Sequence, residues 1–313
     1  MSLRVAILGL GQMGSNHLRI LSMLKDVVVS NVFDIDHERS EKVSELYQVP
    51  FTTDLEEALS DIDAVVIATP TKTHFEYFKL SSEKVKNIFI EKPIAETVAE
   101  AAEIKVLSDS KNIFVQCGFI ERFNPVIQEL RNVLKLERVI NSDFFRTNRL
   151  SDRIKDVDVV LDLMIHDIDL AIFLNGPVGE INAYGRREND LVAFASVTIE
   201  HENGAFSRLL ASRITEKKIR LVQVTTSNTY IEAELFRKEL QLHRQSRSTA
   251  SPGSSYIVSS LGEQIEVKPQ EALLVQVQAF LSGCMGEKLD YLPGPAAGLE
   301  ALRVAEKVVG SID

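Results

Sequence analysis

Residues 5–14 have the sequence VAILGLGQMG, an apolar run followed by three glycines in the spacing GxGxxG. The spacing alone is a weak signal, because glycine is common in turns. Its context is more specific, since the apolar run before it and the amphipathic stretch after it form a strand–turn–helix pattern. In such a unit Gly9 permits the tight turn, Gly11 lets the backbone approach a pyrophosphate, and Gly14 allows the helix to pack closely on the strand. The stretch therefore predicts a dinucleotide-binding turn.

An acidic residue about 20 positions further on, at the end of the second strand, is the expected companion of this turn, and Asp34 occupies that place. Its carboxylate can accept hydrogen bonds from the ribose hydroxyls of NAD but would repel the 2′-phosphate of NADP. The first helical residues, Gln12 and Met13, would offer free N–H groups to the phosphates. Arg39 could serve a 2′-phosphate, but we favour a solvated side chain there. We therefore predict NAD rather than NADP.

The first 120 residues or so alternate short apolar strands with amphipathic stretches, which is typical of a parallel sheet with helices on both faces. The predicted strands are 4–8, 27–33, 64–68, 87–90 and 113–117, and the predicted helices are 13–24, 37–47, 54–59, 74–82 and 98–108. We assign residues 1–121 to a doubly wound, Rossmann-type NAD-binding domain.

The pattern changes after this region, and residues 122–313 are assigned to a second, α+β domain that would hold the substrate. Runs with a period of two predict a large, mostly antiparallel open sheet with helices on one face. These runs are 138–146, 181–185, 193–201, 205–212, 221–225, 230–235 and 239–243. The predicted helices are 125–136, 159–174, 270–282 and 296–309, and the Ser-, Gly- and Pro-rich segment 246–255 predicts an exposed loop.

The composition narrows the classes of function. The chain has 313 residues, 45% of them hydrophobic and 26% charged, which is an ordinary globular profile, and its formal net charge is -10. Nucleic acid and anionic membranes call for a basic face, so neither is an expected partner. Two cysteines, Cys117 and Cys284, without metal-ligand spacing predict a reduced, cytoplasmic setting. No signal-like or membrane-spanning run is present, so we expect a soluble protein.

Polar residues follow two strands at the edge where parallel sheets bind ligands. The third strand ends in Ala68-Thr69-Pro70, with His74 four residues further on, and the fourth ends in Glu91-Lys92-Pro93. A lysine at a strand end, beside a turn that proline restricts, is held in place. Lys92 is therefore a candidate site residue, whereas the other lysines are expected to be solvated.

Asp162 and His166 lie four residues apart in an otherwise apolar helical stretch. On a helix they would share one face, where the carboxylate could orient the imidazole and tune its pKa. A lone histidine on such a helix is more often structural, but the pairing with an acid favours function. The pair could also be half a metal site, although no third ligand has a suggestive spacing.

Together these motifs resemble the Gfo/Idh/MocA oxidoreductases, over essentially the full chain, and Glu91-Lys92-Pro93 is the most specific of them. The resemblance implies that Lys92, Asp162 and His166 form the catalytic group. It implies that Thr69, Pro70, His74 and Glu91 line the nicotinamide side, and that the second sheet forms homodimers or tetramers. Met164 departs from the glycine that many members carry, so substrate details from other branches do not transfer directly.

The implied reaction is hydride transfer from a secondary alcohol of a sugar or cyclic polyol to nicotinamide. His166, or Lys92 in some branches, would take the hydroxyl proton, Lys92 would stabilise the developing alkoxide, and Asp162 would position its partners.

Cations crowd the segment before the Asp162 helix, at Arg146, Arg149, Arg153 and Lys155. Arginine forks fit phosphate oxygens, although a solvated loop paired with nearby aspartates is an almost equal alternative. The stretch 121–125, which contains Arg122 and Asn124, and residues 153–157 resemble the branch of the family that oxidises UDP-N-acetylglucosamine at C3. The expected substrate is thus a sugar nucleotide. The alternatives are a free sugar or cyclitol, and, from another class, a non-catalytic NAD-binding sensor.

Overall fold

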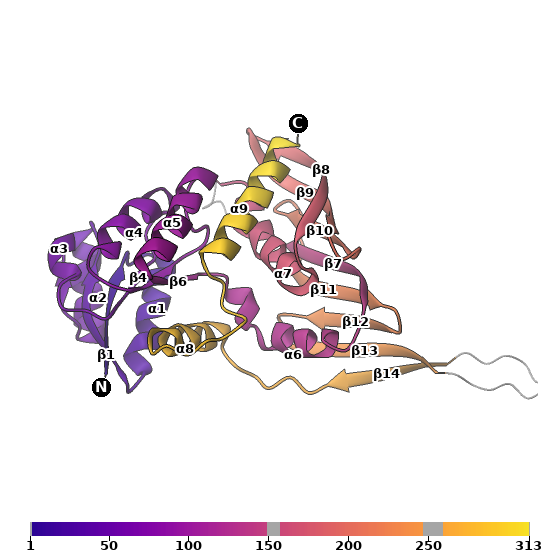
Figure 1. Ribbon diagram of the computed structural model, residues 1–313, viewed down its shortest axis with the longest axis horizontal. Coiled ribbons are helices and arrows are strands. Elements are labelled where there is room, and N and C mark those ends of the chain that lie inside the picture. Colours follow the sequence, from indigo (N-terminus) through magenta and orange to yellow (C-terminus); the bar gives the residue numbers. More distant parts are fainter. Residues whose placement is uncertain (1, 149–156, 247–258, 313) are drawn as a thin grey trace, which may run out of the picture. The chain divides into compact units, whose positions relative to one another are not determined.

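The computed structural model describes residues 2–148, 157–246 and 259–312 (Figure 1). The chain divides into two compact units. The first comprises Met1–Arg122 and Glu271–Arg303, and the second Phe123–Gln270 and Val304–Asp313. The predicted boundary at residue 121 lies within one residue of the first division, but the second predicted domain, 122–313, is not continuous. Residues 271–303 return to the first unit.

The first unit contains a six-stranded parallel sheet in the order β3-β2-β1-β4-β5-β6. Its strands are β1 (Leu3–Leu8), β2 (Val27–Phe33), β3 (Phe51–Thr52), β4 (Ala64–Ile67), β5 (Asn87–Ile90) and β6 (Phe114–Cys117). Its helices are α1 (Gln12–Met23), α2 (His37–Tyr47), α3 (Leu55–Ala58), α4 (His74–Ser82), α5 (Val98–Lys111) and α8 (Ala272–Cys284), with short 3-10 turns η1 (Thr71–Thr73) and η2 (Ile120–Phe123). The strand order reverses beside β1, and such a switch point is where this fold binds ligands.

Helix α8 belongs to the first unit because its apolar side chains complete that unit's core. Leu273, Val277 and Phe280 are buried in one cluster with Leu18 of α1 and Phe89 of β5. The free energy gained by burying this apolar surface explains why a segment so far along the chain returns to the N-terminal sheet. The sequence predicted the helix but not its destination.

The second unit contains an eight-stranded sheet in the order β14-β13-β12-β11-β7-β10-β9-β8. Its strands are β7 (Val139–Thr147), β8 (Val178–Glu188), β9 (Leu191–His201), β10 (Phe206–Ser212), β11 (Ile219–Thr226), β12 (Thr229–Glu234), β13 (Glu239–Ser246) and β14 (Ser259–Ile265). All neighbouring pairs are antiparallel except β7 with β10. The predicted architecture, a Rossmann domain followed by a mostly antiparallel sheet, is confirmed.

Helices α6 (Pro125–Leu134) and α7 (Ile165–Asn175) pack on this second sheet (Figure 1). Alternate residues of the strands are buried, as in β12, where Thr229, Ile231 and Ala233 are buried and Tyr230 between them is exposed. This period of two is the pattern that predicted the sheet. A final helix, α9 (Pro295–Gly310), contributes its first part to the first unit and its last part to the second.

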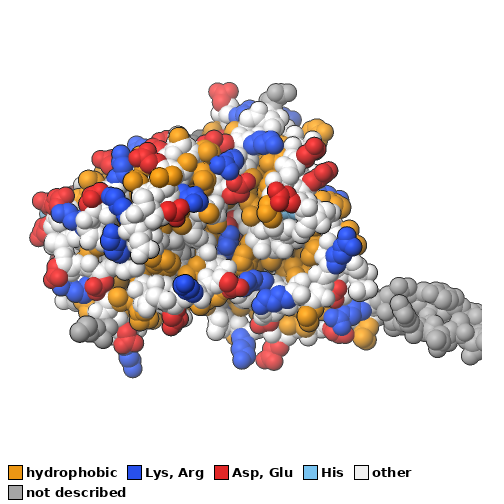
Figure 2. Space-filling view, in the orientation of Figure 1, with side chains coloured by type: hydrophobic (Ala, Val, Ile, Leu, Met, Phe, Trp, Pro, Cys, Tyr) orange, Lys and Arg blue, Asp and Glu red, His pale blue; other side chains and the backbone are white. Residues whose placement is uncertain are grey.

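Charged side chains of both signs are interspersed on the face of the molecule shown in Figure 2, rather than gathered into a patch of one sign. Among the described residues, no helix is long and apolar enough to cross a membrane.

Candidate functional site

The glycine turn joins β1 to α1, and its three glycines have different physical roles. Gly9 has φ +90°, a backbone conformation that side chains rarely adopt. A Cβ on Gly14 would lie 1.8 Å from the carbonyl oxygen of Gly9, so only glycine fits there. A Cβ on Gly11 would meet no described atom within 4 Å. Gly11 therefore leaves open space beside the backbone, as the approach of a pyrophosphate requires.

Helix α1 begins at Gln12, directly after this open space. Its N-cap is Gly11, which has no side chain that could cap the N–H groups of the first turn. These donors and the positive end of the helix dipole suit an anion. The backbone of Gln12, Met13 and Gly14 thus has the donors that the predicted phosphate contact requires.

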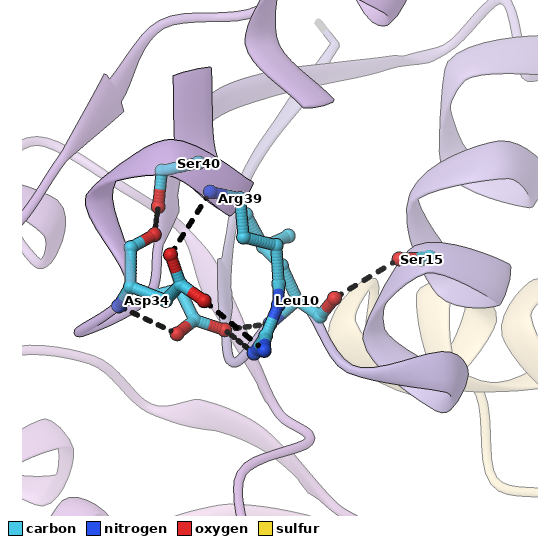
Figure 3. Close-up of polar contacts among 6 residues, drawn as sticks. Leu10, Ser15, Asp34, Arg39 and Ser40 are labelled. Carbon is cyan, nitrogen blue, oxygen red and sulfur yellow. Dashed lines mark hydrogen bonds and ion pairs between the residues drawn. The ribbon is translucent and has the colours of Figure 1, made fainter. Parts of the chain in front are cut away.

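Asp34 lies at the end of β2 and is 6% exposed. Its Oδ2 accepts a hydrogen bond from the Leu10 amide at 2.7 Å, and its Oδ1 accepts one from the Asp36 amide at 3.0 Å. Arg39 of α2 approaches the same carboxylate at 3.2 Å and also pairs with Asp36 (Figure 3). The carboxylate is thus fixed against the glycine turn, where the ribose hydroxyls of NAD would need an acceptor.

A cleft of about 380 Å³ opens at this switch point. Five of the predicted cofactor residues line it, namely Gly9, Gly11, Asp34, Thr69 and Pro70. Ala68, named above as part of the strand-end motif, also lines it, and sequence reasoning did not identify five other lining residues, Phe33, Ile35, Lys72, Thr73 and Tyr77. Most of them neighbour predicted positions in the chain, but nothing in the sequence marks Tyr77, which reaches the cleft from α4 and packs edge-to-face on Phe33 with ring centroids 5.9 Å apart.

His74 does not line this cleft, because it is only 1% exposed. Its Nδ1 lies 2.8 Å from the carbonyl oxygen of Pro93 and its Nε2 lies 2.9 Å from that of Thr69. The imidazole therefore links the chain segments that follow β4 and β5. Burial lowers the pKa of His74, and the two carbonyls offset only part of that effect. The prediction that this side chain faces the nicotinamide is thus corrected to a supporting role.

His201, in the second unit, is a second buried histidine with a lowered pKa. It is 4% exposed, its Nδ1 faces the Gly176 carbonyl at 2.9 Å, and its Nε2 lies 2.8 Å from Ser207 Oγ. Burial is again the largest cause of the lowered pKa. Protonation of this ring would charge a site enclosed by protein.

We expect both histidines to make the fold sensitive to mild acid. Their pKa values are lower in the folded chain than the value of about 6.5 in an unfolded one, so the unfolded state binds protons first as the pH falls. Their contribution to stability is complete above about pH 6.5 and is lost as the pH falls through the folded pKa. Chemical unfolding at pH 7.5 and 5.5 should show a smaller pH difference in His74→Gln and His201→Gln than in the wild type. An unchanged difference in both variants would contradict this assignment.

The Glu91-Lys92-Pro93 motif lies at the end of β5 in the first unit. The peptide bond between Lys92 and Pro93 is cis. Glu91 is 7% exposed, whereas Lys92 is partly exposed. The burial of Glu91 indicates that its carboxylate faces the interior of the unit, and Lys92 has the exposure that a reacting group needs.

Asp162 and His166 lie in the second unit, where one regular helix over 159–174 is predicted. The structure has a π-helical segment, Val160–Met164, before α7 begins at Ile165. Such segments are rare and are frequent at functional sites. Arg213 donates to Asp162 Oδ2 at 2.9 Å and also to the carbonyl of Val157, so the acid is held by an arginine that sequence reasoning missed.

The structure describes one of the three arginines that are predicted, before the Asp162 helix, to bind the substrate. Arg146 is 1% exposed, and its Nε and Nη2 donate to the two oxygens of Asp167 at 2.7 and 2.6 Å. This buried fork presents no guanidinium surface to a phosphate, so Arg146 is removed from the substrate set. Arg149 and Arg153 lie outside the described residues.

Asn124 and Arg122 are also buried. Asn124 caps α6, since its Oδ1 accepts from the Val126 amide at 3.1 Å, and its Nδ2 donates to the Leu235 carbonyl at 3.4 Å. These contacts position Asn124 within the second unit, and its predicted substrate role stays a prediction. Arg122 is 6% exposed at the end of the first unit, and its predicted role stays a prediction.

Two family models match this chain. Residues 3–119 match the oxidoreductase family with an NAD-binding Rossmann fold, and residues 138–231 match the C-terminal domain of the same family. The chain belongs to the Gfo/Idh/MocA oxidoreductase family. The predicted family, enzyme class and NAD cofactor are therefore confirmed, and the open space at Gly11 with the acceptor at Asp34 fits that cofactor.

Two relatives match almost the whole chain. The UDP-N-acetylglucosamine 3-dehydrogenase of Acidithiobacillus ferrooxidans is 26% identical over 310 residues, which cover 98% of this chain and 96% of the relative. The inositol 2-dehydrogenase of Rhizobium meliloti is 26% identical over 334 residues, covering 100% and 97%.

Two solved structures have the same fold as this chain. The structure of the Acidithiobacillus ferrooxidans enzyme has a TM-score of 0.90 at 24% identity and covers 100% of this chain and 98% of its own. Levoglucosan dehydrogenase in complex with NADH and levoglucosan has a TM-score of 0.85 at 18% identity, covering 99% and 97%.

Proposed function

We propose that this protein is an NAD-dependent dehydrogenase that oxidises a secondary alcohol of a sugar nucleotide, with UDP-N-acetylglucosamine, oxidised at C3, as its substrate. The cleft at the switch point of the first unit, lined by Gly9, Gly11 and Asp34, is the observation that carries the reaction type. The similarity to a UDP-N-acetylglucosamine 3-dehydrogenase along 98% of the chain supports the substrate. The equally long similarity to an inositol 2-dehydrogenase makes a cyclitol the second candidate.

The proposed chemistry assigns one task to each of three side chains. Bound NAD supplies the nicotinamide carbon that receives the hydride from the alcohol carbon. His166 takes the hydroxyl proton as general base, and the ammonium of Lys92 stabilises the alkoxide while the carbonyl forms. Asp162, held by Arg213, positions its partners. The products are a keto sugar, NADH and a proton, which balances the oxidation.

The cofactor itself would be held by the first unit. The first-turn amides of α1 would bind the pyrophosphate, and the space at Gly11 would admit it. Asp34 would accept hydrogen bonds from the ribose hydroxyls. Thr69 and Pro70, at the end of β4, would line the same cleft further along.

We also propose a homodimer or homotetramer formed through the second sheet. Tyr184, Phe206 and Tyr230 are exposed apolar side chains on strands of that sheet, and covering them would bury apolar surface. Light scattering of the purified chain measures the assembly directly.

The substrate assignment is tested by following NADH formation with NAD and a panel of alcohols. We expect turnover with UDP-N-acetylglucosamine and little with free N-acetylglucosamine, levoglucosan or myo-inositol. Turnover with myo-inositol alone would favour the second candidate, and NAD binding without turnover of any alcohol would favour a sensor.

Binding of UDP, measured by calorimetry in the presence of NAD, separates diphosphate recognition from catalysis. A charge-assisted contact to phosphate is worth about 1.5–3 kcal/mol, so Arg149→Ala or Arg153→Ala should weaken UDP about 10- to 100-fold. Arg244→Ala, which changes an exposed arginine that lies 3.8 Å from Glu263, is the control.

A further inference from the structure

His17 of α1 is completely buried, although the sequence assigns it no role. It is 0% exposed, and its Nε2 lies 2.7 Å from Glu91 Oε1. Its ring packs edge-to-face on Phe89, with centroids 4.8 Å apart. A polar ring in the centre of the first unit thus joins helix α1 to the end of β5.

The donor and acceptor of this contact can be assigned. An ionised carboxylate only accepts hydrogen bonds, so Nε2 of His17 must carry the proton and donate to Glu91. Nδ1 of the same ring is buried and has no hydrogen-bond partner among the described residues. A second proton there would be a buried donor with no acceptor. The contact with Glu91 is therefore the one hydrogen bond that the described residues give this ring.

The carboxylate of Glu91 is held from several sides. While Oε1 receives His17, Oε2 accepts the backbone N–H of Lys92 at 3.2 Å. Behind it, a Cβ on Gly118 would lie 2.5 Å from Oε2 and 2.9 Å from the Cα of Glu91, so the residue at 118 must be glycine for the carboxylate to fit. Glu91 thus links the ring of His17 to the backbone of Lys92. We call this His17–Glu91–Lys92 link the brace.

We propose that His17 is a positioning residue for Lys92, acting through Glu91. The contact ties the helix that would hold the pyrophosphate to the strand end that carries the ammonium. It also explains why Glu91 is buried, whereas the resemblance had placed it against the nicotinamide. The role of Lys92 in this inference rests on the proposed function. The contact between His17 and Glu91 does not.

The test uses two variants that keep different halves of the imidazole. The amide nitrogen of glutamine can reach the place of Nε2, whereas that of the shorter asparagine reaches only the place of Nδ1. With UDP-N-acetylglucosamine and NAD, we expect His17→Asn to lower kcat about 10- to 100-fold through misplacement of Lys92. His17→Gln should retain most of the activity. Arg19→Gln, on the same helix but directed to Glu271, is the control.

Hydrogen exchange at the Lys92 amide gives a readout that needs no substrate. Loss of the brace should speed this exchange about tenfold in His17→Asn and leave it nearly unchanged in His17→Gln. Glu91→Gln, which weakens the same brace from its other end, should also speed it and serves if His17→Asn does not fold. The proposal would be overturned if both His17 variants lost activity equally and in proportion to their loss of melting temperature. Unchanged Lys92 exchange in folded His17→Asn or Glu91→Gln would also overturn it. If the wild type turns over none of the alcohols, the proposed function fails, while the exchange data still decide the positioning.

Discussion

Replacing Lys92 by alanine is expected to lower kcat about 10²- to 10⁴-fold while NADH still binds. The ammonium is proposed to stabilise the alkoxide as the proton leaves, and alanine removes this charge without touching the glycine turn or Asp34. The same range is expected for His166→Ala, which removes the proposed base. Turnover is measured by NADH formation and cofactor binding by NADH fluorescence.

Lys105→Ala is the matched control for Lys92→Ala. Lys105 lies on α5 of the same unit and pairs with Asp109 at 2.7 Å on an exposed surface. Such pairs contribute about 0–1 kcal/mol, so kcat should be unchanged. If Lys92→Ala and His166→Ala both retain wild-type turnover with NAD bound, the catalytic assignment is wrong and the chain would be better described as a nucleotide-binding protein.

Two alanine substitutions in the glycine turn are expected to differ in their effect on stability, although both should weaken NAD binding. Gly14→Ala places a Cβ 1.8 Å from the backbone oxygen of Gly9, so the helix or the strand must shift. We expect a loss of about 3 kcal/mol or more in the free energy of unfolding, at the upper end for overpacking. Thermal unfolding measures it, and weaker NAD binding should accompany it.

Gly11→Ala adds the same methyl group where no described atom lies within 4 Å. The free energy of unfolding should change by no more than about 1 kcal/mol, the typical effect of a change at an N-cap. The methyl group would occupy the path of the pyrophosphate, and losing one or two charge-assisted hydrogen bonds should raise the Kd for NAD about 10- to 100-fold. If Gly11→Ala binds NAD as tightly as the wild type, the pyrophosphate does not lie beside Gly11.

The sequence predicted the type of most elements in both units, but not every strand or the local helix geometry. Alternating hydrophobicity predicted most of the large sheet, but β14 was missed, as was β3 in the first unit, which has only two residues and hence no period. The π-helical segment at Val160–Met164 was predicted as ordinary helix, because one widened turn leaves the apolar pattern almost unchanged. The arginine that holds Asp162 comes from position 213, and no local pattern connects the two.

Local patterns by themselves determined the family, the Rossmann domain and the cofactor. The glycine spacing, the strand before it and Asp34 lie within one strand–helix–strand unit, where backbone sterics and helix geometry make short-range sequence decisive. Glu91-Lys92-Pro93 is likewise contiguous, so its place at a strand end followed from the alternation of elements.

Only the tertiary structure decided which polar residues face a ligand and which hold the fold together. Arg146 and His74 had motifs or charges that suggested ligand contact, yet Arg146 pairs with Asp167 and His74 bridges two backbone carbonyls in the interior. His17 carried no signal, although it contacts Glu91 from 74 positions away. The physical reason is that burial and hydrogen-bond partners depend on long-range packing. A buried polar group must find its partner wherever the fold places one.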